Sequence, residues 1–64
     1  MGDKTMSDNV NIQYQTVVGN WITVNVVLNI PANIINAMRS VASMYNGARV
    51  RAVDENGRVV DILT

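Results

Sequence analysis

Cysteine and histidine are both absent from this chain of 64 residues. The chain therefore forms no disulfide bond and lacks the usual ligands of zinc. Histidine is also the commonest general base, and cysteine is a strong nucleophile, so the most frequent catalytic groups are missing. A domain this small buries only about 60% of its unfolded surface and usually gains support from disulfides, a metal or a partner subunit. We therefore expect any such support to come from oligomerisation.

Charged residues are scarce, and five basic residues balance five acidic ones. Lys4 is the single lysine and lies near the N-terminus, while Asp54 and Glu55 are adjacent in a predicted turn. Neither these residues nor Asp61 form the opposed pair of carboxylates that glycoside hydrolysis requires, and no phosphate-binding or calcium-binding loop motif is present. We predict that the protein is not an enzyme and that it binds no cofactor and no metal.

Long apolar runs are absent too, so the sequence predicts no membrane-spanning segment and no signal peptide. We expect a soluble, cytoplasmic protein. Residues 1–9 are polar and without pattern, which predicts a flexible N-terminal tail, and residues 10–64 are predicted to form a single domain.

Residues 10–28 alternate between apolar and polar side chains, as two strands with one buried face do. A two-residue loop at Gly19 and Asn20 would set the apolar residues of one strand against the polar residues of the other. A three-residue loop, Val18 to Asn20, keeps apolar side chains together, and we predict this register. It puts Val26 and Leu28 on the buried face with Ile12. It places Trp21 outside the main core.

Residues 31–45 form the one predicted helix. Pro31 suits the first turn, Asn29 is the nearest side chain able to cap it, and Asn46 with Gly47 ends it. One apolar stripe runs along the helix at helical spacing. It consists of Ile34, Met38, Val41 and Tyr45, flanked by Ile35 and Ala42.

A second hairpin is predicted over residues 48–63. We predict a three-residue loop over residues 55–57, because this register keeps apolar side chains opposite apolar ones and opposite charges together. The predicted cross-strand pairs are Val50 with Ile62, Ala52 with Val60, and Arg51 with Asp61.

The predicted fold is α+β with element order β-β-α-β-β, a four-stranded sheet with one helix packed on one face. This order resembles the β-grasp, in which the first and last strands are parallel neighbours at the centre of the sheet. The resemblance is one of pattern, so no β-grasp function is transferred to this chain.

A more local resemblance concerns the segment GARVRAVDENGRVVDIL, residues 47–63. It is similar to a C-terminal hairpin of small proteins encoded by tailed phages and prophages, most of which have no assigned activity. The resemblance implies a viral origin, and hence the host cytoplasm as the location. It implies no role for any particular residue.

The helix covers one side of the sheet, so the other side is left for a partner. Valines there can reflect strand propensity alone, but a patch that includes the single tryptophan is larger than a monomer usually exposes, and we favour an interaction surface. The candidate protein-interaction residues are Val17, Trp21, Val27, Arg49, Arg51, Val53, Val59 and Leu63.

The sequence thus predicts a non-enzymatic protein-interaction module, phage-encoded, that forms a homodimer or other homo-oligomer or docks on a host protein. One alternative is a nucleic-acid-binding protein that uses Trp21 for stacking together with its arginines. The zero net charge disfavours this alternative, and the arginines are not expected to converge. The four arginines of the predicted domain are Arg39, Arg49, Arg51 and Arg58.

A second alternative is a minor structural protein of a virion.

We predict that Trp21→Ala weakens an assembly or partner contact and leaves the monomer folded, because the register places Trp21 outside the core. Circular dichroism during thermal unfolding and the solution mass by light scattering check the two parts. A variant that unfolds like a core mutant would show that the register of the first hairpin is wrong.

Overall fold

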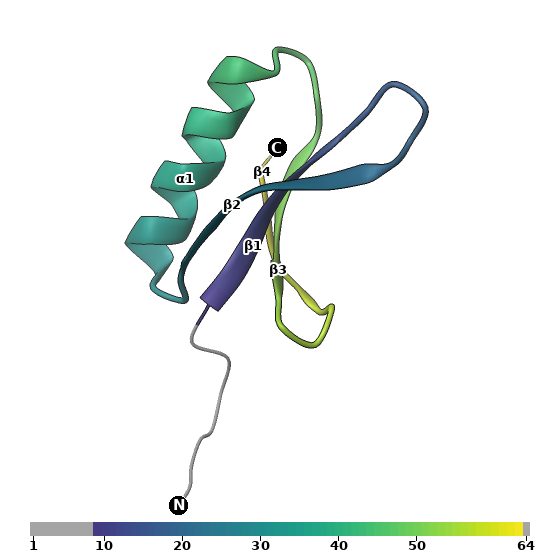
Figure 1. Ribbon diagram of the computed structural model, residues 1–64. Coiled ribbons are helices and arrows are strands. Elements are labelled where there is room, and N and C mark those ends of the chain that lie inside the picture. The colour runs from purple at the N-terminus through teal and green to yellow at the C-terminus, as the bar shows by residue number, and fades with distance from the viewer. Residues whose placement is uncertain (1–8, 64) are drawn as a thin grey trace, which may run out of the picture.

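The computed structural model describes residues 9–63 as one antiparallel sheet with a helix along one side (Figure 1). The elements are β1 (Asn9–Gln15), β2 (Trp21–Leu28), α1 (Pro31–Met44), β3 (Val50–Asp54) and β4 (Val59–Leu63). This confirms the predicted α+β class and the β-β-α-β-β order. β1 begins at Asn9, inside the predicted tail, and the rest of that tail lies outside the described residues.

The strand order is β2-β1-β3-β4, so β1 and β3 are the central strands and pair antiparallel. The parallel pairing of first and last strands expected from the β-grasp resemblance is therefore wrong. β3 is central because its Val50, Ala52 and Val53 side chains are buried, whereas the side chains of β4 are mostly exposed. The connection through α1 passes over β1, which leaves β2 and β3 parallel to each other on either side of it.

The hydrophobic core lies between α1 and the two central strands. Met38, Ile12 and Ala52 are each 0% exposed, and the aromatic rings of Tyr14 and Tyr45 stack with centroids 3.9 Å apart beside them. The predicted helix stripe is confirmed. The buried cluster is Val10, Ile12, Ile34, Ala37, Met38, Val41, Val50 and Ala52.

The ends of α1 follow the expected chemistry in part. Pro31 occupies the first turn as predicted, and Gly47 adopts a φ of +83° after the C-terminal end. The N-cap residue, however, is Ile30, which makes no side-chain capping bond, so the N-cap is not Asn29. The backbone carbonyl of Ile30 instead accepts the first helical hydrogen bond, from the N–H of Ile34 at 3.0 Å.

Both hairpins use a three-residue loop that ends in a left-handed glycine. In the first, Gly19 has a φ of +97° and donates its N–H to the Thr16 carbonyl at 2.9 Å. The loop is therefore residues 17–19, one position earlier than predicted. In the second, Gly57 has a φ of +82° and donates to the Asp54 carbonyl at 3.0 Å, which confirms the predicted loop over residues 55–57.

Each edge strand contains a β-bulge that changes its register away from the loop. The pairs Gln13–Thr23 and Ile12–Asn25 leave Val24 unpaired in β2. The pairs Val53–Val59 and Ala52–Asp61 leave Val60 unpaired in β4. An extra residue turns over every side chain beyond it. The predicted register of the second hairpin is correct near its loop, where Val53 pairs with Val59. The predicted pairs of the first hairpin are shifted because its loop begins one position earlier, but the faces assigned near the loop are correct. Beyond the bulges both predicted registers are wrong, and the observed pairs include Val10 with Val27, Arg51 with Ile62 and Val50 with Leu63.

We predict that Met38→Asp unfolds the domain. An unpaired buried charge costs several kcal/mol, and the whole stability of a domain is only about 5–15 kcal/mol. Urea unfolding followed by circular dichroism checks this, with Ser40→Asp on the exposed side of α1 as the control. Similar midpoints for the two variants would show that Met38 is not in the core.

Candidate binding face

The candidate site is the side of the sheet opposite α1, which we call the open face. The strand registers assign its residues. Arg49, the residue before the start of β3, joins them because its carbonyl accepts the N–H of Gln15 at 2.9 Å. The open face comprises Asn9, Asn11, Gln13, Gln15, Trp21, Thr23, Val26, Leu28, Arg49, Arg51, Val53, Val59 and Ile62.

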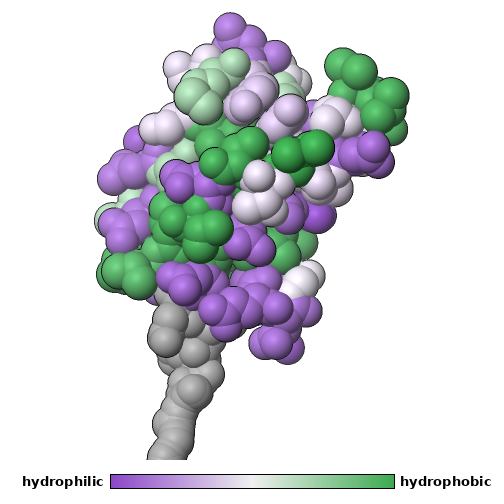
Figure 2. Space-filling model, viewed as in Figure 1, coloured by the Kyte–Doolittle hydropathy of each residue, from purple (hydrophilic) through white to green (hydrophobic). Residues whose placement is uncertain are grey.

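Five of the predicted interaction residues lie on this face. They are Trp21, Arg49, Arg51, Val53 and Val59. The other three do not. Val27 and Leu63 pack against the core on the helix side, because the bulges turn them over. Val17 is 105% exposed at the tip of the β1–β2 loop rather than on the sheet. This loop projects from the body, and Figure 2 shows an apolar patch there.

Three open-face residues were predicted to be core. They are Val26, Leu28 and Ile62, and all three are exposed. The sequence carried one signal of this exchange, namely the adjacent apolar residues at 26–28 and 62–63, where strict alternation fails. Such runs do not show which member faces the helix, and only the bulge decides it.

A hydrogen-bonded row of side chains crosses three strands of the open face. The Nε–H of Arg51 on β3 donates to Oε1 of Gln13 on β1 at 2.8 Å. The Nε2 group of Gln13 donates to Oγ1 of Thr23 on β2 at 3.1 Å. Gln13 therefore uses both ends of its amide, and this bridge restricts the orientation of the Arg51 side chain.

The guanidinium of Arg51 also lies over the indole ring of Trp21, with its central carbon 4.0 Å from the ring centroid. Trp21 is opposite Gln15 on β2, so the Arg51 side chain reaches diagonally across β1 to meet it. This is a cation–π contact, which favours a fixed guanidinium orientation. Two of the predicted interaction residues are thus brought into contact.

The described part of the open face carries two arginines and no carboxylate. Arg49 and Arg51 lie on the same strand line, on the same face. The predicted pairing of Arg51 with Asp61 is wrong, because Asp61 is opposite Ala52 on the helix side of the register. The acidic residue of β3, Asp54, accepts the backbone N–H groups of Asn56 and Arg58 in the β3–β4 turn, each at 2.9 Å.

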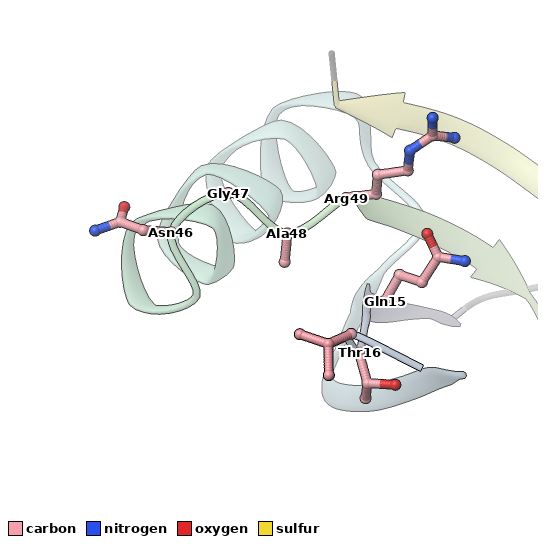
Figure 3. Close-up of a pocket in the computed structure, with 7 residues that line it drawn as sticks. Gln15, Thr16, Asn46, Gly47, Ala48 and Arg49 are labelled. Carbon is pink, nitrogen blue, oxygen red and sulfur yellow. The ribbon is translucent and has the colours of Figure 1, made fainter. Parts of the chain in front are cut away.

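A shallow hollow lies at one end of the sheet, between the β1–β2 loop and the segment that joins α1 to β3. It is lined by Gln15, Thr16, Val17, Asn46, Gly47, Ala48 and Arg49 (Figure 3). The side chains of Arg49 and Gln15 extend away from Asn46. The lining includes no acidic side chain, and its hydroxyl, that of Thr16, already accepts the N–H of Asn20 at 3.1 Å. The hollow therefore offers no acid–base pair for catalysis.

Residues 9–63 contain no cluster of three acidic residues that could hold a metal ion. None of the helices in this part of the chain is long and apolar enough to cross a bilayer.

No protein-family model, curated protein or solved structure matches the chain. The resemblance of residues 47–63 to phage-encoded hairpins and the predicted binding role both stay predictions, and the function has to be argued from the open face.

We predict that Gln13→Leu releases Arg51 from Trp21, because the substitution removes the acceptor for the Arg51 Nε–H. Loss of these exposed or partly buried bonds destabilises the fold by about 1 kcal/mol. The measurement is the emission maximum and anisotropy of Trp21, the single tryptophan of the chain. Asn11→Leu, at the next open-face position of β1, is the control. Unchanged emission in Gln13→Leu would mean that Gln13 does not orient the pair.

Proposed function

We propose that the protein is a non-enzymatic interaction module that binds a partner protein through its open face. The observation that carries this proposal is the contact of Arg51 on a central strand with Trp21 on an edge strand, on a sheet face that no described helix covers. Tryptophan and arginine are the residue types most enriched among interface residues that dominate binding energy.

Apolar side chains line both edge strands of the same face. Val26 and Leu28 on β2 are 53% and 54% exposed, and Val59 and Ile62 on β4 are 43% and 56% exposed. Exposure on this scale is costly for a small monomer unless the surface is used. A polar centre with apolar borders is typical of a specific docking surface. It is less readily explained by the strand propensity of valine and isoleucine alone.

The edges of the sheet are less suited to pairing than its face. β2 and β4 are both edge strands, and each contains a bulge. A bulge twists an edge strand and interrupts the row of backbone groups that another strand would pair with. We therefore assign the interaction to the open face.

The charge of the open face favours a different chain over a second copy. Two copies stacked face to face would bring Arg49 and Arg51 of each together, with no carboxylate on either open face to compensate. The resemblance of residues 47–63 to phage-encoded hairpins supports a host protein as the partner. A homodimer through this face is the competing outcome of the test below.

Nucleic acid is the second candidate, since arginines and a tryptophan share one face. Arg39, however, is on the exposed side of α1, and Arg58 is opposite Asp54 on the helix side. Among residues 9–63, Arg49 and Arg51 are the basic residues that remain on the open face for phosphate contacts, whereas a protein whose binding to nucleic acid depends strongly on salt makes about 6–10 such contacts. The geometry therefore favours a protein partner.

We predict that the double variant Val26→Thr with Ile62→Thr loses partner binding and stays folded. Threonine retains strand propensity and removes the apolar border. Proteins captured from lysate on immobilised wild type, on the double variant and on Met44→Gln are quantified by mass spectrometry. Met44 is an exposed apolar residue of α1 and serves as the control.

Species captured by wild type and by Met44→Gln should be lost only with the double variant. Light scattering at low and high salt should show a monomer. A dimer that the double variant abolishes would assign the face to a second copy, and equal capture by all three proteins would contradict a role for the face.

A further inference from the structure

We infer that the open face recognises an acidic segment of its partner, in which a carboxylate binds Arg51 and neighbouring apolar side chains contact the two borders. This inference rests on the proposed function and adds the chemistry of the partner. It follows from three features of the face, which are the orientation of Arg51, the distribution of charge and the position of the apolar residues.

Arg51 is oriented before any ligand arrives. Its Nε–H is bound to Gln13 and its guanidinium carbon lies 4.0 Å from the centre of the Trp21 ring, so two contacts restrict the side chain. Among the described residues these are the contacts of its guanidinium, which leaves both terminal amino groups for a ligand. A planar fork with two parallel N–H donors matches the two oxygens of a carboxylate. Prior ordering lowers the entropy that binding costs.

The surrounding charge selects a negative ligand. Arg49 adds a second positive charge on the same strand line, and no acidic residue lies on the described open face. A carboxylate placed between these arginines would gain attraction from both. An uncharged ligand would leave both guanidinium groups partly desolvated without an ionic partner, which is unfavourable.

The apolar borders select a polypeptide rather than a small anion. β2 and β4 are separated by three strand spacings, or about 14 Å, which is slightly wider than an α-helix of about 10–12 Å diameter. Val26 and Leu28 line one border, and Val59 and Ile62 line the other. One helix or extended segment that carries glutamate or aspartate among apolar residues therefore fits the face.

The row of amides on β1 supports this assignment. Asn11 and Gln15 lie on either side of Gln13, at the centre of the open face. The amide of Asn11 can donate to the backbone carbonyl of a bound segment and accept from its N–H groups. The Nε2 group of Gln15 already donates to the Gly19 carbonyl at 3.2 Å, which orients the Gln15 amide and leaves its oxygen to accept an N–H. Nucleic acid would instead use Trp21 as a stacking surface, and the guanidinium of Arg51 already covers one side of that ring.

The test uses the emission of Trp21, because the chain has no other tryptophan. The full chain is titrated with a blocked peptide in which leucine alternates with glutamate, with its counterpart that has glutamine in place of glutamate, and with oligothymidylate. We expect saturable binding of the glutamate peptide, and a Kd at least about tenfold higher for the glutamine peptide, as loss of a charge-assisted hydrogen bond implies.

Three variants distinguish the contribution of the Arg51 guanidinium geometry from that of its positive charge. Arg51→Gln should raise the Kd of the glutamate peptide by about tenfold or more, and Arg51→Lys should recover only part of this loss because it lacks the planar fork. Arg39→Gln removes the same charge from the exposed side of α1 and should leave the Kd within about twofold, as expected for a distant surface charge.

Equal affinity for the two peptides, or no response to either, would overturn the inference. The capture experiment judges the proposed function separately. If the Val26→Thr with Ile62→Thr variant loses its captured partners and the peptides fail, the face binds a protein without acidic recognition. If oligothymidylate binds more tightly than the glutamate peptide, and capture is insensitive to the double variant, both proposals fall.

Discussion

The packing of one helix on two central strands determines what the rest of this small protein exposes. The apolar stripe of α1 covers one side of β1 and β3, and Met38, Ile12 and Ala52 are excluded from solvent where they meet. A single helix cannot cover both sides of a four-stranded sheet. Burial of one side of the sheet therefore leaves the other side exposed to solvent. The proposed function is argued from the residues on that exposed side.

The bulges in the edge strands determine which side chains reach that surface. Val24 and Val60 are the extra residues, and each turns over the half of its strand that lies beyond it. Val27 and Leu63 consequently strengthen the core, and Val26 and Ile62 become exposed. The same irregularity makes the edges poor templates for another strand. One local feature thus completes the core, protects the edges and supplies apolar borders to the open face.

The contacts at the middle of the open face connect the fold to the proposed recognition. Three strands contribute to the row of Arg51, Gln13 and Thr23, and Trp21 lies against the guanidinium of Arg51. Arg51 is far from the other three residues in the chain and meets them because β3 pairs with β1. The pairing of the two central strands thereby fixes the orientation of the Arg51 guanidinium. An arginine on a flexible surface would lose more conformational entropy when it bound a ligand.

The sequence by itself determined the element types, the helix stripe, the loop of the second hairpin and the absence of the commonest catalytic groups, because these depend on local periodicity and on residue type. It also placed Trp21 outside the core, because the odd number of residues in the first loop determines which side chains of the two strands share a face. Only the tertiary structure decided the strand order, the bulges and the partners of Arg51. Strand pairing depends on which strand can be buried on both sides, and β3 meets this condition through contacts with β1 that no local pattern contains. Adjacent apolar residues such as Val26 and Val27 are equally suited to either side, and packing against α1 made the choice.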